Sequence, residues 1–177
     1  ALPMAGILSG RINPSGKLAM TFPYSTGQIP IYYNRRKSGR GHQGFYKDIT
    51  SDPLYPFGHG LSYTEFKYGT VTPSVTKVKR GDRLSVEVTV TNVGARDGAE
   101  TVHWFISDPY CSITRPVKEL KHFEKQLIRA GETKTFRFDI DLERDFGFVN
   151  EDGKRFLEAG EYHILVQGQT VKIELID

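Results

Sequence analysis

The sequence predicts a mainly β protein whose larger part is an antiparallel β-sandwich. After about residue 63, apolar and polar residues alternate with a period of two in at least five short stretches. This alternation is the pattern of strands that bury one face. Turns that contain glycine separate the stretches, and many short strands with frequent turns are typical of a sandwich.

Each of the five strands is expected where every second side chain is apolar. These positions are Leu84, Val86, Val88 and Val90; Val102, Trp104 and Ile106; Phe136, Phe138 and Ile140; Tyr162, Ile164 and Val166; and Val171, Ile173 and Leu175. Trp104 is expected in the core, because a large aromatic residue fills the ~10 Å between two sheets. The pair Asp152-Gly153 predicts a tight hairpin, because both residues tolerate positive φ.

Residues 120–128 fit the alternation less well. The apolar residues Leu120, Phe123, Leu127 and Ile128 have a spacing closer to that of a short amphipathic helix. The surrounding glycine-bounded β pattern favours an irregular or bulged strand instead, and we adopt the strand.

The first 62 residues do not read as a complete domain. Residues 1–9 predict the end of a helix that Gly10 closes as a C-cap. Residues 18–22 predict a short strand that ends at Pro23, and residues 34–51 form a glycine-containing stretch typical of a long loop. We therefore divide the chain into residues 1–62, the terminal remnant of an α/β domain with a linker, and residues 63–177, the sandwich.

Composition argues against several classes of partner. The chain has 24 basic and 21 acidic residues, a formal net charge of +3, and no single basic face is evident, so nucleic acid is not an expected partner. The longest apolar runs fall far short of the ~20 residues of a membrane span. Cys111 is the one cysteine, which excludes an internal disulfide.

No catalytic, metal or cofactor motif stands out. The acidic residues fall mostly at turns or on polar strand faces, and the five histidines lack the spacing of metal ligands. His103 and His163 alternate with apolar strand positions, so both are expected to be solvated. The aromatic residues before residue 58 could stack on sugar rings, but packing between parts of the protein is the favoured explanation.

Several sequence blocks resemble glycoside hydrolase family 3, which includes β-glucosidases and β-xylosidases. Asn-Pro-Ser-Gly-Lys-Leu-Ala-Met-Thr-Phe-Pro at 13–23, Gln-Ile-Pro-Ile-Tyr-Tyr-Asn at 28–34 and Pro-Leu-Tyr-Pro-Phe-Gly-His-Gly-Leu-Ser-Tyr-Thr-Glu-Phe at 53–66 carry this resemblance. Blocks at 90–100, 112–123 and 130–133 are similar to the fibronectin type III-like, immunoglobulin-like terminal domain of the family.

The resemblance implies a longer parent enzyme with a barrel, an α/β domain and this terminal sandwich. Its nucleophile and its acid/base both belong to motifs upstream of residue 13, so no catalytic residue is assigned in this chain. The expected function is a non-catalytic C-terminal region that supports hydrolysis of terminal β-linked sugars. The alternative is a free-standing sandwich module that binds carbohydrate or protein.

Three further expectations concern contacts of the chain. The upstream catalytic domains of the parent are the expected partner, and self-association through residues 1–22 is expected if those apolar residues stay uncovered. Arg40, His42 and Tyr46 are candidates for the rim of the substrate site, by analogy with terminal regions of some family members. The same analogy suggests a periplasmic or secreted parent, although the residues themselves indicate no compartment.

Overall fold

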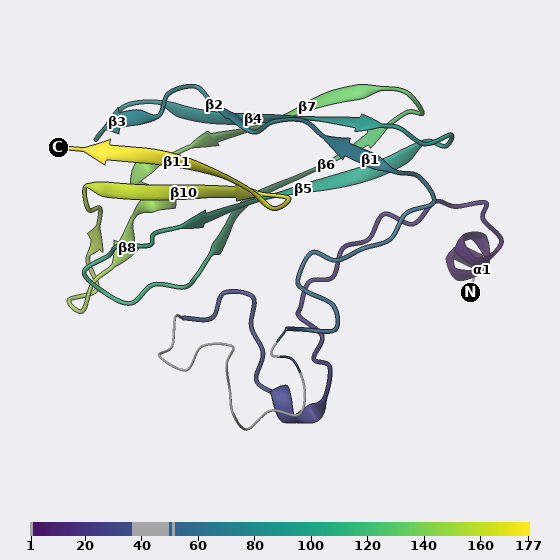
Figure 1. Ribbon diagram of the computed structural model, residues 1–177, viewed down its shortest axis with the longest axis horizontal. Helices are drawn as coiled ribbons and strands as arrows, with labels where there is room; N and C mark the ends of the chain where they lie inside the picture. The colour runs from purple at the N-terminus through teal and green to yellow at the C-terminus, as the bar shows by residue number, and fades with distance from the viewer. Residues whose placement is uncertain (1, 37–49, 51) are drawn as a thin grey trace.

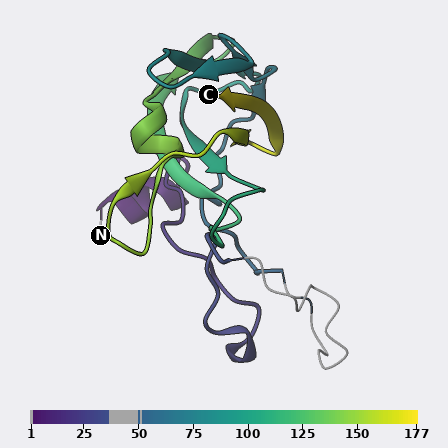
Figure 2. The same ribbon diagram turned by 90° about the vertical axis from the view of Figure 1, so that its left-hand side faces the viewer.

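The computed structural model describes residues 2–36, 50 and 52–177 of the chain. Two sheets lie face to face after residue 65, and the described residues before them extend from one side of this sandwich (Figures 1 and 2). The predicted fold class is confirmed: the protein is mainly β, with antiparallel sheets and a short helix near its N-terminus.

The first sheet is built around one long strand. β4 (Leu84–Asn92) pairs antiparallel with β7 (Thr133–Ile140) over most of its length. Two short strands, β1 (Phe66–Tyr68) and β2 (Thr72–Pro73), also pair antiparallel with β4, near its end and near its beginning. The alternation in β4 turns Val86, Val88 and Val90 toward the other sheet, as the sequence predicts.

The second sheet has five strands. Their order is β3 (Lys77–Lys79), β11 (Gln169–Ile176), β10 (Gly160–Val166), β5 (Gly98–Ser107) and β6 (Glu119–Ile128). Neighbours are antiparallel except β3 and β11, which are parallel. β11 therefore lies inside the sheet, between β10 and β3.

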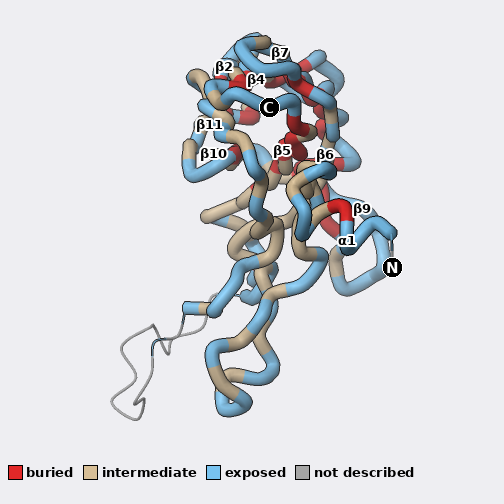
Figure 3. Tube along the Cα trace, turned by 90° about the vertical axis from the view of Figure 1, so that its right-hand side faces the viewer, coloured by how far each residue is buried: buried red, intermediate tan, exposed pale blue. Residues whose placement is uncertain are grey.

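The core lies between the two sheets, where most of the buried residues gather (Figure 3). Trp104 on β5 is fully buried, and its ring centroid lies 6.1 Å from that of Phe138 on β7. The predicted core position of Trp104 is confirmed. Its indole N–H has no hydrogen-bond partner within the described residues.

Residues 119–128 form β6, so the predicted irregular strand is confirmed. Trp104 pairs with His122, but the next residue, Phe105, pairs with Leu120, which leaves Lys121 as an extra residue in a bulge. The bulge reverses the alternation, so that Leu120 and Phe123 lie on the same face of the sheet. This reversal explains why the apolar spacing looked helical.

Two small elements follow β7. A single π-helical turn, η2 (Leu142–Phe146), buries Leu142, Asp145 and Phe146. A hairpin of β8 (Phe148–Val149) and β9 (Arg155–Phe156) comes next. It turns through Asp152-Gly153, where the φ of Gly153 is 74°, and the predicted hairpin is therefore confirmed.

The N-terminal helix is also confirmed. α1 spans Leu2–Leu8, and Gly10 follows with a φ of 73° and donates its N–H to the Ile7 carbonyl oxygen at 2.9 Å. A left-handed glycine just after the last turn is a common helix end. A short 3₁₀ turn, η1 (Thr26–Gln28), follows later in the segment.

The predicted strand at residues 18–22 is wrong. Only one isolated bridge forms, between Phe22 and Tyr55, while the Leu18 N–H donates to the His59 carbonyl oxygen. The segment opposite carries Pro56 and turns on itself, with the His59 N–H donating to the Pro56 carbonyl oxygen. A partner that contains proline and a turn cannot provide the continuous ladder that a strand needs.

Candidate interdomain site

Residues 2–36 and 52–62 contact the sandwich through several hydrogen bonds, an ion pair and aromatic rings, and we call these contacts the joint. At one end, Asn13 accepts hydrogen bonds from the Ser62 hydroxyl (2.9 Å) and the Tyr63 N–H (2.8 Å) through Oδ1. Its Nδ2 donates to the Asp97 carbonyl oxygen at 3.0 Å. One side chain thus ties three separate segments together.

Two further hydrogen bonds fix the helix end to the same place. Arg96 Nη2 donates to the Gly10 carbonyl oxygen at 2.8 Å, and the Tyr63 hydroxyl donates to the Ile7 carbonyl oxygen at 2.8 Å. Carbonyl groups in the last turn of a helix lack partners within the helix. The Ile7 carbonyl oxygen thus accepts a second hydrogen bond besides that of Gly10 N–H, and both new donors belong to residues 63–177.

A buried charge lies in the middle of the joint. Glu100 points inward from β5, and its side chain is only 7% exposed. Its Oε1 receives hydrogen bonds from Lys17 Nζ (3.0 Å) and from the Tyr68 hydroxyl (2.8 Å). The cation for a carboxylate of the sandwich therefore comes from residues 2–62.

Aromatic side chains form the other end of the joint. Tyr33 stacks on Phe57 with ring centroids 4.3 Å apart, and both rings contact Phe105 of β5 at 5.9 and 6.2 Å. Phe57 also lies 5.7 Å from His103. Domain packing, the favoured explanation for the aromatic residues, accounts for these two residues of the N-terminal segment.

The expectation that His103 is solvated is wrong. Its ring is partly buried between Phe57, Phe105 and Phe123. Burial lowers the pKa of His103, and the nearby Lys17 ammonium lowers it further, against the opposing effect of Glu100. His163 is also only partly exposed, and its Nε2 lies 2.7 Å from Glu161 Oε1.

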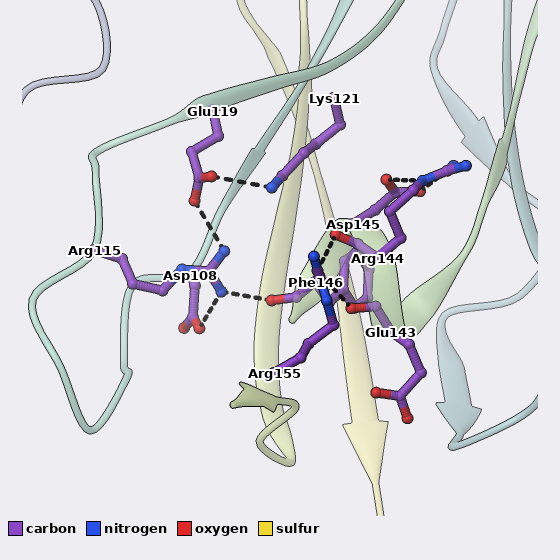
Figure 4. A network of polar contacts seen from close by, with 9 residues as sticks. All are labelled: Asp108, Arg115, Glu119, Lys121, Glu143, Arg144, Asp145, Phe146 and Arg155. Atoms are coloured by element: carbon purple, nitrogen blue, oxygen red, sulfur yellow. Dashed lines mark hydrogen bonds and ion pairs between the residues drawn. The ribbon is translucent and has the colours of Figure 1, made fainter. Parts of the chain in front are cut away.

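A second polar network lies where β5 and β6 are connected. Arg115 is buried, with its side chain 4% exposed. Its Nη1 donates to Asp108 Oδ2 at 3.1 Å and to the Phe146 carbonyl oxygen at 2.6 Å, and its Nη2 donates to Glu119 Oε1 at 2.9 Å (Figure 4). The guanidinium also lies 5.5 Å from the ring centroid of Phe148.

The charges in this network stabilise one another. Burial alone would lower the pKa of Arg115, but hydrogen bonds and attraction from Glu119 and Asp108 raise it above its ordinary value. Burial alone would raise the pKa of Glu119, whereas Lys121 and Arg115 together hold that pKa below its ordinary value. Both groups are therefore charged at neutral pH, as a buried ion pair requires.

The loop that carries Arg115 also contacts residues 2–36. Val117 N–H donates to the Arg35 carbonyl oxygen at 2.8 Å, beside an isolated bridge between Arg36 and Pro116. Lys118 Nζ lies 4.7 Å from the ring centroid of Phe105, which belongs to the aromatic cluster of the joint. The network inside the sandwich and the joint outside it are thus connected.

The three predicted rim residues, Arg40, His42 and Tyr46, lie outside the described residues. The structure describes the positions on both sides of them. Arg36 bridges to Pro116, and Gln28 Nε2 donates to the carbonyl oxygens of Thr50 (2.7 Å) and Asp52 (3.1 Å). The chain on each side of the candidate residues is therefore held by hydrogen bonds.

Several large apolar side chains before β1 are exposed. Those more than 60% exposed are Leu2, Met4, Leu8, Met20, Ile29, Tyr32 and Leu61. Leu2, Met4 and Leu8 lie on α1, and the others lie between α1 and β1. The three exposed apolar side chains on α1 offer apolar surface that a partner could cover.

The described residues, 2–36, 50 and 52–177, contain no group of three or more His, Cys, Asp or Glu side chains placed to hold a metal ion. Within the same ranges, no helix is long and apolar enough to cross a membrane.

Sequence reasoning missed Lys17 and Glu100. It assigned Arg115-Pro116 to a rigid joint between domains but did not find the buried charge network of Arg115. Glu100 occupies an inward position of β5, in phase with Val102 and Trp104. A charged residue on the buried face of a strand requires a partner. The position of Glu100 in the alternation therefore indicates a buried ion pair, and sequence reasoning could have used it. No comparable signal marks Lys17, because its partner lies 83 positions away in the sequence.

Comparison with known proteins gives two matches to family models. Residues 3–63 match the glycosyl hydrolase family 3 C-terminal domain, and residues 100–170 match a fibronectin type III-like domain. Among curated relatives, a periplasmic β-glucosidase of Salmonella typhimurium is 39% identical over 97% of this chain, and a thermostable β-glucosidase B of Acetivibrio thermocellus is 40% identical over 92%.

Solved structures agree with these matches. A β-glucosidase from Erythrobacter marinus superposes with a TM-score of 0.90 at 41% identity over 98% of this chain. A β-glucosidase from Listeria innocua in complex with isofagomine gives 0.89 at 39% identity over 97%. The chain spans about a quarter of these proteins: 23% of the Salmonella, Acetivibrio and Erythrobacter proteins and 26% of the Listeria protein. The matched part is their C-terminal portion.

Proposed function

Because the chain belongs to glycoside hydrolase family 3, we propose that it is the non-catalytic C-terminal region of a β-glucosidase-like enzyme that hydrolyses terminal β-linked sugars. The joint is the observation that carries this proposal. It holds residues 2–62 on the sandwich through Asn13, Lys17 and the stacked rings of Tyr33 and Phe57. A rigid joint of this kind suits a support that fixes one domain relative to another.

The buried carboxylates of the described residues form ion pairs. Retaining hydrolysis needs two carboxyl groups about 5 Å apart, one ionised and one protonated. In the described part, the buried acids Asp108, Glu100 and Asp145 each face a basic residue that neutralises them. Carboxylates held in this way are poor candidates for a nucleophile or a general acid, which supports a role outside the chemistry.

We further propose that residues 1–62 end an α/β domain and that residues 63–177 form the support. The family-model match ends at residue 63, and β1 begins at Phe66. The exposed side chains of Leu2, Met4 and Leu8 on α1 favour an upstream domain as the surface that covers them, because burying each would contribute roughly 1.5–3 kcal/mol.

Self-association through residues 1–22 is a second way in which this apolar surface is covered. In the chain alone, we expect dimers or larger species at high concentration, because no upstream domain covers α1. Light scattering coupled to size exclusion tests this. The double variant Leu2→Ser/Leu8→Ser should lower the associated fraction, and a monomeric wild-type chain at all concentrations would contradict the proposal.

Arg40, His42 and Tyr46 are proposed to contribute to the rim of the substrate site in the full-length enzyme. The proposal is supported by the fixed positions on both sides of them, at Arg36 and Thr50. Alanine at each position should raise KM for a disaccharide more than for an aryl glucoside. Equal KM values for wild type and all three variants would refute it.

The support function has a direct test. The 177-residue chain should not hydrolyse a chromogenic aryl β-glucoside, whereas a full-length enzyme should lose activity when residues 63–177 are deleted. Turnover by the pure chain that disappears on mutating one of its acids would contradict the proposal. Full activity of the deletion variant would equally contradict it, and would favour the free-standing binding module.

A further inference from the structure

The connection between β5 and β6, residues 108–118, is irregular and yet is held from inside the sandwich. We propose that Arg115 is a positioning residue that fixes this loop so that its outer edge holds residues 33–36 against the sandwich. The inference deepens the proposed function and rests on it, because residues 33–36 belong to the joint and lead into the proposed rim segment.

Three separate elements meet at the Arg115 guanidinium. Asp108 lies at the end of β5, Glu119 begins β6, and the Phe146 carbonyl oxygen ends the π-helical turn η2 (Figure 4). A planar guanidinium presents several N–H donors in a fixed fork, so a single side chain can define three distances at once. The positions of both ends of the loop relative to η2 therefore depend on Arg115.

The outer edge of the loop contacts residues 33–36, so the position of these residues depends on that of the loop. The hydrogen bond from Val117 to the Arg35 carbonyl oxygen and the bridge between Arg36 and Pro116 lie immediately after Arg115 in the sequence. Further along, Lys118 lies over the ring of Phe105, which contacts Tyr33. The loop thus contacts Arg35 and Arg36 directly, through a backbone hydrogen bond and a bridge, and is linked to Tyr33 through the ring of Phe105 on β5.

Stability alone does not account for the arrangement. A buried ion pair is often no more stabilising than apolar side chains of the same volume, and the sandwich already has a large apolar core. The ion pairs of Arg115 define the geometry of a loop that lacks a continuous ladder of backbone hydrogen bonds. If Arg115 only stabilises the fold, its loss should speed amide exchange throughout the sandwich. If Arg115 positions the loop, its loss should speed exchange mainly in the loop.

The first test uses the 177-residue chain and the double variant Arg115→Met/Asp108→Asn, which removes both buried charges together. Amide hydrogen exchange followed by NMR should show Val117 exchanging at least tenfold faster, while the Val88 amide in the centre of the first sheet changes less than twofold. Arg115→Lys should give an intermediate rate at Val117. Arg137→Met is the matched control, because Arg137 makes two carboxylate contacts at the surface.

The second test uses the full-length enzyme. Arg115→Lys should raise KM for a β-linked disaccharide at least threefold and leave kcat within twofold, whereas Arg137→Met should change neither. Faster Val117 exchange with an unchanged KM would support the positioning role and refute the rim proposal. An unchanged Val117 exchange rate in a folded double variant would overturn the inference about Arg115, whatever the KM values.

Discussion

The pair of Lys17 and Glu100 allows a sharp prediction about how the two parts of the chain depend on each other. Lys17→Met removes the ammonium that lies 3.0 Å from the Glu100 carboxylate but keeps most of the aliphatic stem. The carboxylate then keeps one neutral donor, the Tyr68 hydroxyl at 2.8 Å. A buried charge without its counterion should destabilise the fold.

The magnitude follows from burial. Removing one partner of a buried ion pair costs about 3–5 kcal/mol. The Lys17 side chain is 20% exposed and that of Glu100 is 7% exposed, so some solvent reaches the pair and we expect a loss somewhat below this range, about 2–3 kcal/mol. The double variant Lys17→Met/Glu100→Gln should recover about 1–2 kcal/mol of this loss, because a neutral side chain replaces the unpaired charge.

Urea unfolding followed by far-UV circular dichroism and by Trp104 fluorescence measures these losses. Lys77→Met is the control, because Lys77 pairs with Glu174 at the surface, with side chains 67% and 50% exposed. The free energy of unfolding of this variant should fall by less than about 1 kcal/mol. If Lys17→Met costs no more than Lys77→Met, or if the double variant shows no coupling, the reasoning is refuted.

Substitutions at three other residues, Trp104, His103 and Gly98, test the core and the joint. Trp104→Ala should lower the free energy of unfolding in urea by about 3–5 kcal/mol. Trp104→Phe should lower it clearly less, because the buried indole N–H has no hydrogen-bond partner to lose. Equal losses for the two variants would show that the indole nitrogen matters. The pKa of His103 is lowered in the fold, so the unfolded state binds the proton first and the free energy of unfolding should fall as pH drops from 7 through ~6.5. His103→Gln should flatten that slope between pH 7 and 5.5, and an unchanged slope would exclude His103 as its source. Gly98→Ala would place a Cβ 2.9 Å from Asn13 Nδ2 and 2.7 Å from the Thr64 side chain, so it should lower the free energy of unfolding by about 1–3 kcal/mol. Gly16→Ala is the control: a Cβ at Gly16 has nothing within 4 Å, so this variant should be neutral in the same assay.

The strands of the sandwich could be predicted because their information is local. The alternation in residues 84–90 and 162–166 gives the buried face of each strand directly. The short strands β1, β2 and β3 have two or three residues each, too few for a periodic pattern. Their pairing depends on residues far along the chain, and sequence reasoning did not find them.

The joint could be predicted only in outline. Arg115-Pro116 and the proline and aromatic residues at 53–66 favour a rigid joint over a flexible tether. The ion pair of Lys17 with Glu100, by contrast, is decided by the three-dimensional fold. The error at residues 18–22 has the same origin. The alternation there is real, but the segment opposite, with Pro56 and its turn, does not provide a continuous ladder.

The interior place of β11 has a consequence for synthesis on the ribosome. Lys77 on β3 aligns with Glu174 on β11, so β3 has no neighbour in its sheet until residues 169–176 have left the exit tunnel. Contacts between residues so far apart in sequence form slowly, and unpaired strand edges invite association with other chains. The nascent sandwich therefore stays open along β3 and β10 until translation has passed β11.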